Sequence, residues 1–488
     1  MSASTASVSA ASSASVSARA SWLRERGMGA SVLVTAISAA FGVILISAMG
    51  FLSALMRANP YIGDSGTLAL VLGVLVFVIV GIAVYVASIV TANTFSTVVA
   101  GRTRRIALMR LIGASARSQR GQVARQGLAV GGIGAAIGLV AGILLSIGGI
   151  ALAERTLELP AVGYVVVQPV LLLPAAIVAL TTWAAAWVGS RRVLSVTPLQ
   201  AIAGSVELSR EQVTRRPARN VAAIVLLALG GALLALGVLA GLVSPLGVLI
   251  AFVGGILSFT GLALGAALIM PPVLRLVGRA FGRAAAARLA AENALRYPER
   301  SSRMAIGVVM GVTLVTMFAV ALASIKLVLT QSAGGHLAPE MGTILDTVAA
   351  IMMGLVAVSA VIAAVGLVNL LTIGVVQRRR ELGLLRALGL SVRQVRRVVL
   401  LEAAHITIAA VVTGLVLGVV YGWAGAQSLL GSVRMSPDAV AGGTLVWPAV
   451  PLWPTIWIVV ATAVLTLIAA VVPTRLATRV TPVEALAE

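Results

Sequence analysis

The sequence predicts an all-α polytopic membrane protein with about ten transmembrane helices, arranged as two parallel four-helix repeats and a linking two-helix hairpin. Composition is the first observation. The 488 residues are 60% hydrophobic and only 10% charged, with a mean hydropathy of +1.08, whereas soluble domains carry about a quarter of their residues as charged side chains. Too little polar surface remains to cover a soluble fold, which excludes soluble multidomain enzymes. The chain has no cysteine, so disulfide scaffolds, thiol catalysis and zinc–cysteine sites are also excluded.

Long apolar runs are the second observation. A helix needs roughly 20 mainly apolar residues to cross about 30 Å of hydrocarbon. Ten such runs are present, and the fifth and sixth are joined only by a turn at Ser244 and Pro245. The predicted spans are 30–56, 67–98, 126–153, 169–190, 220–242, 247–270, 304–328, 347–376, 401–425 and 453–473.

The distribution of basic residues is the third observation. Of 36 basic residues, 32 lie at the two termini and in the loops near 99–125, 191–219, 271–303 and 377–400. Cytoplasmic loops carry an excess of Lys and Arg, so both termini are expected to be cytoplasmic. The net charge of +21 is therefore a topology signal, and no nucleic-acid partner is expected. A single lysine in 488 residues is typical of a GC-rich bacterial genome, which predicts the bacterial inner (plasma) membrane.

An internal repeat divides the chain. At an offset of 276 residues, eight polar or glycine positions and one leucine between Asn93 and Arg120 are identical to those between Asn369 and Arg396. Four helices per repeat keep the orientation of the chain, so the repeats should be related by an axis along the membrane normal. The predicted divisions are a cytoplasmic segment at 1–29 with a disordered start, the first repeat at 30–203, a cytoplasmic linker at 204–219, the hairpin at 220–270, a cytoplasmic amphipathic segment at 271–303 and the second repeat at 304–488.

The duplicated segments 102–120 and 378–397 carry the clearest functional signal. Each combines leucines at helical spacing with arginines and then reaches a Gly-x-Ser turn. Glycine suits a helix C-cap and serine an N-cap, which predicts a short amphipathic helix, a tight turn and a second basic helix. One interpretation is a helix lying on anionic lipid headgroups; the other is a pair of equivalent docking elements for a two-fold partner.

The stretch Arg-Arg-Arg-Glu-Leu-Gly-Leu-Leu-Arg-Ala-Leu-Gly-Leu-Ser at 378–391 resembles the FtsX-like/MacB-type permease domain of ABC transporters. The C-terminal run from Pro473 and the segment 289–300 resemble the same family. The resemblance implies a transmembrane subunit whose loop between the second and third helices docks on a cytoplasmic homodimeric ABC ATPase. The coupling residues that it implies are Arg104, Leu108, Arg110, Gly113, Ser115, Arg380, Glu381, Leu384, Arg386, Gly389 and Ser391.

The sequence departs from the family pattern in two respects. Arg105 and Gln126 stand in the first repeat where the second has Glu381 and Glu402, so the halves are not equivalent. The connections at 57–66 and 329–346 are also too short for the large extracytoplasmic domain that many relatives carry. Mechanisms that rely on that domain therefore do not transfer.

The chain itself carries no expected catalytic site. A P-loop requires Gly-x-x-x-x-Gly-Lys-Ser/Thr, and the one lysine, Lys326, follows Ala-Ser-Ile. ATP and Mg²⁺ are thus expected in a partner chain, with no cofactor or metal here. His405 and Glu402 fall near the inner end of the ninth helix, where an interfacial ion pair of Glu402 with Arg396 or Arg397 is the favoured interpretation.

Glycine stripes on the third helix of each repeat favour close helix packing within lipid. They comprise Gly134, Gly138, Gly142, Gly414, Gly418 and Gly422.

These observations favour an ABC transporter permease that exports or extracts an amphiphilic substrate such as a lipid, antimicrobial peptide or drug. Efflux and antibiotic resistance follow by analogy with the family, with membrane lipid and an accessory membrane or sensor protein as further partners. Two alternatives stay open: an ion-driven secondary transporter, and a non-transporting FtsX-like regulator that transmits force.

Overall fold

The computed structural model describes the chain in several stretches. They are 28–58, 73–92 (without 83, 87 and 90), 108–109, 111–112, 115–156, 162–195, 217–280, 284–296, 298–332, 334–335, 342, 384, 386–432, 445 and 447–477. Within these stretches the chain forms helices, turns and loops and contains no strand. The predicted fold class, an all-α polytopic membrane protein, is confirmed.

Most predicted spans correspond to a described helix. The helices are α2 (Met28–Arg57), α5 (Ala116–Thr156), the 3₁₀ helix η2 (Pro169–Leu171), α6 (Leu172–Ser195), α9 (Pro217–Gly241), α10 (Gly247–Ala280), α11 (Ala285–Arg296), α12 (Pro298–Ser332), α15 (Val392–Leu430) and α16 (Leu452–Ala477). Helical residues also occupy 73–92, here called the 73–92 helix. Seven helices are long and apolar enough to cross a membrane, two shorter apolar helices cover Gly73–Val86 and Leu452–Ile468, and the predicted span 347–376 lies outside the described residues.

Two helices, α5 and α15, are much longer than a membrane crossing requires. They contain 41 and 39 residues, which at 1.5 Å per residue gives lengths of about 60 Å. The sequence predicted a basic helix after each Gly-x-Ser turn and membrane spans at 126–153 and 401–425. In the structure each basic segment and the span that follows it form one continuous helix.

The helix α10 also differs from the prediction, which ended the span at 270, before Pro271. The helix continues through Pro271 and Pro272 to Ala280. Prolines are tolerated inside membrane helices where neighbouring groups satisfy the freed backbone. Before the two prolines, α10 is joined to α12, because the Ser302 hydroxyl donates a hydrogen bond to the Ala266 carbonyl at 3.0 Å. The segment 271–303 is therefore the end of α10, the amphipathic helix α11 and the start of α12.

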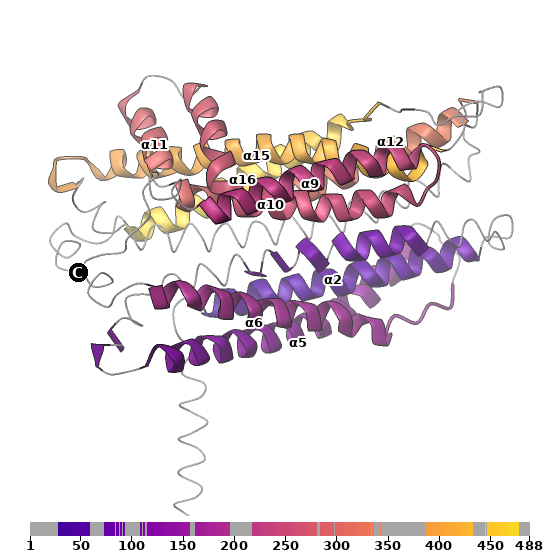
Figure 1. The fold of residues 1–488 in the computed structure, drawn as a ribbon, viewed down its shortest axis with the longest axis horizontal. Helices are drawn as coiled ribbons and strands as arrows, with labels where there is room; N and C mark the ends of the chain where they lie inside the picture. The colour runs from indigo at the N-terminus through magenta and orange to yellow at the C-terminus, as the bar shows by residue number, and fades with distance from the viewer. Residues whose placement is uncertain are drawn as a thin grey trace, which may run out of the picture.

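The described helices form two groups (Figure 1). The N-terminal group contains α2, α5 and α6, which contact one another, and the second group contains α9, α10, α12, α15 and α16. One apolar core joins them, because Phe41, Leu45 and Met49 of α2 belong to the same buried cluster as Met310 and Leu314 of α12. The hairpin α9–α10 packs on α15 of the second group. Its turn is closed by the backbone N–H of Gly247, which donates to the Ser244 carbonyl at 3.0 Å.

Candidate functional site

The first duplicated segment presents apolar side chains outward just before α5 begins. Leu108 and Ile112 lie on one helical turn, closed by the Ile112 N–H, which donates to the Leu108 carbonyl at 3.3 Å. Ile112 is 80% exposed. Ser115 then caps α5, because its hydroxyl accepts a hydrogen bond from the Ser118 N–H at 3.1 Å. The segment therefore presents an apolar turn directly before a helix cap.

The second segment repeats this arrangement before α15. The Leu388 N–H donates to the Leu384 carbonyl at 2.9 Å, and Leu388 is 72% exposed. Gly389 follows with φ +98°, a left-handed conformation that glycine adopts without the Cβ penalty. Ser391 and Gln394 then form a reciprocal capping box, at 3.3 Å from the Gln394 N–H to the Ser391 hydroxyl and 2.8 Å from the Ser391 N–H to Gln394 Oε1.

Both segments lie at the same end of the molecule, where α5 and α15 begin (Figure 1). Exposed arginines continue along the first turns, at Arg117 in α5 and at Arg393, Arg396 and Arg397 in α15. Each segment is therefore an apolar turn with a basic margin, set on the end of a long helix. Of the predicted coupling residues, Leu108, Ser115, Leu384, Arg386, Gly389 and Ser391 belong to these segments, whereas Arg104, Arg110, Gly113, Arg380 and Glu381 lie outside the described residues.

The start of α5 is additionally held against α6. The Arg120 guanidinium carbon lies 4.2 Å from the centroid of the Trp187 ring, which is a close cation–π contact. This contact joins the start of α5 to α6.

The glycine stripes lie where α5 crosses α2 and where α15 crosses α12. A Cβ atom added at Gly138 would press on the Ala36 carbonyl and lie 2.7 Å from the Ala39 Cβ. One added at Gly414 would lie 3.1 Å from the Val309 carbonyl and 2.8 Å from the Val312 Cβ.

The two crossings share one register. Gly138 and Gly414 are equivalent at the 276-residue offset, and each meets a carbonyl together with the Cβ three residues further on. The same holds for Gly142, which meets Ala40 and Val43, and for Gly418, which meets Thr313 and Thr316. Gly134 packs on Val32 and Thr35, and Gly422 packs on Met317 and Val320.

The hairpin helix α10 is tied to α15 by polar contacts at two depths. Near the coupling end, the buried His405 Nε2 lies 2.7 Å from the Leu274 carbonyl. A carbonyl only accepts, so Nε2 carries the proton and donates. Further from that end, the Tyr421 hydroxyl lies 2.9 Å from the Ser258 hydroxyl, which itself donates to the Gly255 carbonyl at 3.1 Å.

A third polar contact joins α10 to the 73–92 helix. The Tyr85 hydroxyl lies 2.7 Å from the Thr260 hydroxyl and donates to the Ile256 carbonyl at 3.2 Å. Sequence reasoning singled out none of Tyr85, Ser258 and Tyr421. The available signal was their polarity inside apolar spans, where hydroxyls commonly bond between helices.

The described residues offer no metal centre. They contain no group of three or more His, Cys, Asp or Glu side chains able to hold a metal ion. Glu402 and His405 are the buried acid and histidine of the described part of the chain. They lie one turn apart on α15, and the His405 ring is already engaged by the α10 backbone.

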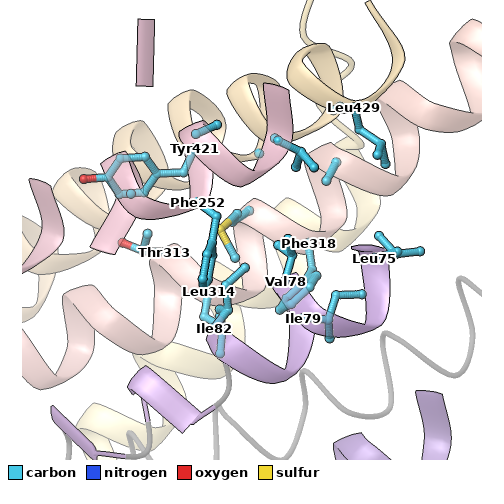
Figure 2. A pocket seen from close by; sticks show the side chains of 18 of the residues that line it. Leu75, Val78, Ile79, Ile82, Phe252, Thr313, Leu314, Phe318, Tyr421 and Leu429 are labelled. Carbon is cyan, nitrogen blue, oxygen red and sulfur yellow. The ribbon is translucent and has the colours of Figure 1, made fainter. Parts of the chain in front are cut away.

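An apolar cavity of about 190 Å³ lies between the two groups of helices. Its lining comes from α2, the 73–92 helix, α9, α10, α12 and α15. Figure 2 shows Tyr421 at one end of this cavity and Leu75 and Leu429 at the other, with Phe252 and Leu314 between them. The molecule thus combines two exposed duplicated segments at one end with an apolar cavity between its helices, within an all-α polytopic membrane protein.

Comparison with known proteins agrees with this class. The family described as "FtsX-like permease C-terminal" matches residues 77–198 and 353–482, just over half of the chain. The protein belongs to the FtsX-like permease family. A stretch of 84 residues is 27% identical to an uncharacterized ABC transporter permease of Methanocaldococcus jannaschii, covering 17% of this chain and 21% of that protein. The chain therefore spans about a fifth of the length of the curated relative that it matches.

Proposed function

We propose that this protein is the transmembrane subunit of an ABC transporter and converts ATP hydrolysis by a separate ATPase into export or extraction of an amphiphilic substrate. The observation that carries the proposal is the pair of coupling segments. Leu108 and Ile112 in one, and Leu384 and Leu388 in the other, are exposed at the ends of helices that run unbroken into the membrane. A partner that pressed on both turns would move α5 and α15 directly.

The proposed architecture is a covalent pseudo-dimer of two MacB-type repeats, 30–203 and 304–488, joined by the linker 204–219, the hairpin 220–270 and the segment 271–303. It is supported by the shared register of Gly138 against α2 and Gly414 against α12. The two separate matches to the family have similar lengths and agree with it. A duplicated docking surface suits a two-fold partner, and we take that partner to be an ATPase homodimer that holds the ATP and Mg²⁺.

In this proposal both termini and both coupling segments are cytoplasmic, in a bacterial inner membrane. The basic residues carry this orientation, since they cluster at the end where α5 and α15 begin. The subunit is non-catalytic. It forms the path for the substrate and transmits the movement of the ATPase to the membrane helices. Membrane lipid surrounds it, and an accessory membrane or sensor protein completes the assembly.

The cavity supports an amphiphilic cargo, because apolar walls within the membrane suit a hydrophobic moiety. Drug or antimicrobial-peptide efflux, and hence resistance, is the physiological role that we infer. An ion-driven transporter is not favoured, since the His405 ring is bonded to a backbone carbonyl rather than placed among acids. A non-transporting regulator would use the same coupling segments but has no need for the cavity.

The test removes the apolar contact without disturbing the fold. The double variant Ile112→Ser with Leu388→Ser changes two side chains that are 80% and 72% exposed. Buried anchors at protein interfaces are worth about 2 kcal/mol or more each, so ATPase recovery should fall by well over ten-fold. The measurement is vanadate-sensitive ATP hydrolysis, together with azido-ATP photolabelling, of the complex purified from its host membranes.

The matched control is Leu276→Ser. Leu276 lies on α10, toward the end of the molecule that carries the coupling segments, and it is 65% exposed. It should leave ATPase recovery within two-fold of the parent, because a single exposed leucine outside an interface contributes little. Equal ATPase recovery with the double variant and the parent would refute the proposed docking.

A further inference from the structure

The cavity is confined to the half of the bundle remote from the coupling segments. Chain direction fixes this, because α15 begins at the coupling end and lines the cavity only from Tyr421 onward. The helix α12 contributes residues from Met310 onward, and α10, which runs the other way, contributes none after Phe259. At 1.5 Å per residue, Tyr421 lies about 45 Å along α15 from its start. In the proposed orientation this is the outer-leaflet half of the membrane.

The α10 and α15 walls of the cavity end, on their coupling side, at a row of aromatic rings. Tyr85, Phe259 and Tyr421 follow one another with ring centroids 6.3 Å apart at each step. The two tyrosine hydroxyls are bonded to Thr260 and Ser258, both on α10. The row is therefore held in place by α10, and on α12 the lining continues past it to Thr313 and Met310.

The rest of the lining is hydrocarbon. Among the lining residues that the structure describes, Thr313 and the two tyrosines of this row are the only ones with polar side chains. A dry apolar void of about 150 Å³ already accepts benzene, and this one measures about 190 Å³. Met49, Met310 and Met317 line it with flexible thioether chains that adapt to irregular shapes. An unfilled void also forfeits dispersion contacts, which a close-fitting chain restores.

A large part of the wall comes from the hairpin. Val248, Ala251, Phe252, Gly255 and Ile256 of α10 face the cavity, and α10 lies outside both matches to the family. The cavity is therefore built with an element that the two matched segments do not supply.

We propose that this cavity binds a single hydrocarbon chain of an amphiphile that enters from the leaflet opposite the coupling segments. The biological purpose of this binding rests on the proposed transport function. Binding of an acyl chain in the cavity, by contrast, depends on this protein alone and needs no ATPase. Most of the lining lies in the half of the bundle remote from the coupling segments, so the headgroup stays at the far surface. The ligand class is a fatty acyl chain, carried either by a membrane lipid or by an acylated peptide.

Substitution of either of two glycines would place a side chain in the cavity. Gly255 and Gly425 both line it, and a Cβ added at either meets nothing within 4 Å. A leucine at either position would project into open space, and glycine-to-leucine exchange favours the helix. The matched control is Gly231→Leu on α9, where an added Cβ is equally free but the residue does not line the cavity.

The experiment uses the full chain, without an ATPase, in nanodiscs of phosphatidylethanolamine and phosphatidylglycerol. One arm contains phosphatidylglycerol with a diazirine on its acyl chain, and a second contains a lipopeptide with the diazirine on its acyl chain. After irradiation, adducts are located by mass spectrometry. We expect adducts on α10 and α15 around Gly255 and Gly425 in at least one arm, and the labelled arm identifies the source of the chain.

Gly255→Leu and Gly425→Leu should each reduce cavity adducts by roughly ten-fold, since overpacking opposes entry of the chain. Gly231→Leu should leave them within two-fold. Thermal unfolding of each variant in the same nanodiscs checks that the bundle is intact. Labelling confined to the exposed face of α9, or equal cavity labelling in parent and filled variants, would overturn the inference. Because no ATPase is present, failure of the docking experiment described above leaves this result unaffected.

Discussion

Replacing Gly138 by alanine should destabilise the protein although alanine is the better helix former. The added Cβ would press on the Ala36 carbonyl and lie 2.7 Å from the Ala39 Cβ. Carbon atoms prefer at least about 3.5 Å, so the Ala39 contact alone requires α5 and α2 to separate by about 0.8 Å. Overpacking of this kind costs about 1–3 kcal/mol, whereas the gain in helix propensity is about 1 kcal/mol. The net effect ranges from near zero to a loss of about 2 kcal/mol.

A matched control separates the gain in helix propensity from the cost of overpacking. Gly132 lies on the same helix, and a Cβ added there meets nothing within 4 Å. Gly132→Ala should therefore keep the propensity gain without the overpacking. The free energy of unfolding of Gly138→Ala should lie about 1–3 kcal/mol below that of Gly132→Ala. Thermal unfolding of the purified protein in detergent, followed by intrinsic fluorescence, measures the difference as a lower Tm.

The equivalent position in the second half extends the comparison. Gly414→Ala would place a Cβ 2.8 Å from the Val312 Cβ, so its Tm should fall in the same direction. If Gly138→Ala were as stable as Gly132→Ala, the close approach of α5 to α2 would not be a feature of the folded protein. A fall for Gly138→Ala alone would contradict the equivalence of the two crossings.

Three further changes have defined outcomes. His405→Leu removes the donor to the Leu274 carbonyl and should lower the free energy of unfolding by about 1–3 kcal/mol, seen as a lower Tm; an unchanged Tm would contradict the bond. Ser391→Ala breaks the capping box with Gln394 and should cost about 1 kcal/mol, measured as faster amide hydrogen exchange in the first turn of α15, while exchange at the far end of α15 stays constant. Gly389→Ala introduces a Cβ at a φ of +98° and should cost about 1 kcal/mol, with weaker ATPase recovery as the readout; full recovery would show that this turn can relax.

The predictable part of the fold is what depends on local pattern. Apolar runs of sufficient length predicted α2, α9 and α12 nearly to their bounds, because the bilayer sets a minimum length for each crossing. The turn at Ser244 and the cap at Ser391 follow from the residue types in the same way.

Pairing between distant helices could not be predicted from these patterns. Lipid tails are as apolar as leucine, so hydrophobicity does not specify which helix faces which within a membrane. The contacts of Tyr85 with Thr260 and of Tyr421 with Ser258 join residues 175 and 163 positions apart. The passage of α10 through Pro271 was missed because a proline ends most helices by local rules, whereas membrane helices tolerate it. The coupling segments were found only because they occur twice.

The hairpin contacts both halves of the molecule, which has a consequence for symmetry. His405 and Tyr421 of α15 contact α10 at two depths, and Gly241 of α9 packs against the backbone of Ser428 in α15. On the other side, the Tyr85 hydroxyl of the 73–92 helix lies 2.7 Å from the Thr260 hydroxyl of α10. The hairpin is therefore a bridge between the halves, and it is bonded to a different element of each. A two-fold driver pushing equally on both coupling segments would have to move this bridge or break one of its contacts, so the two halves would not respond alike.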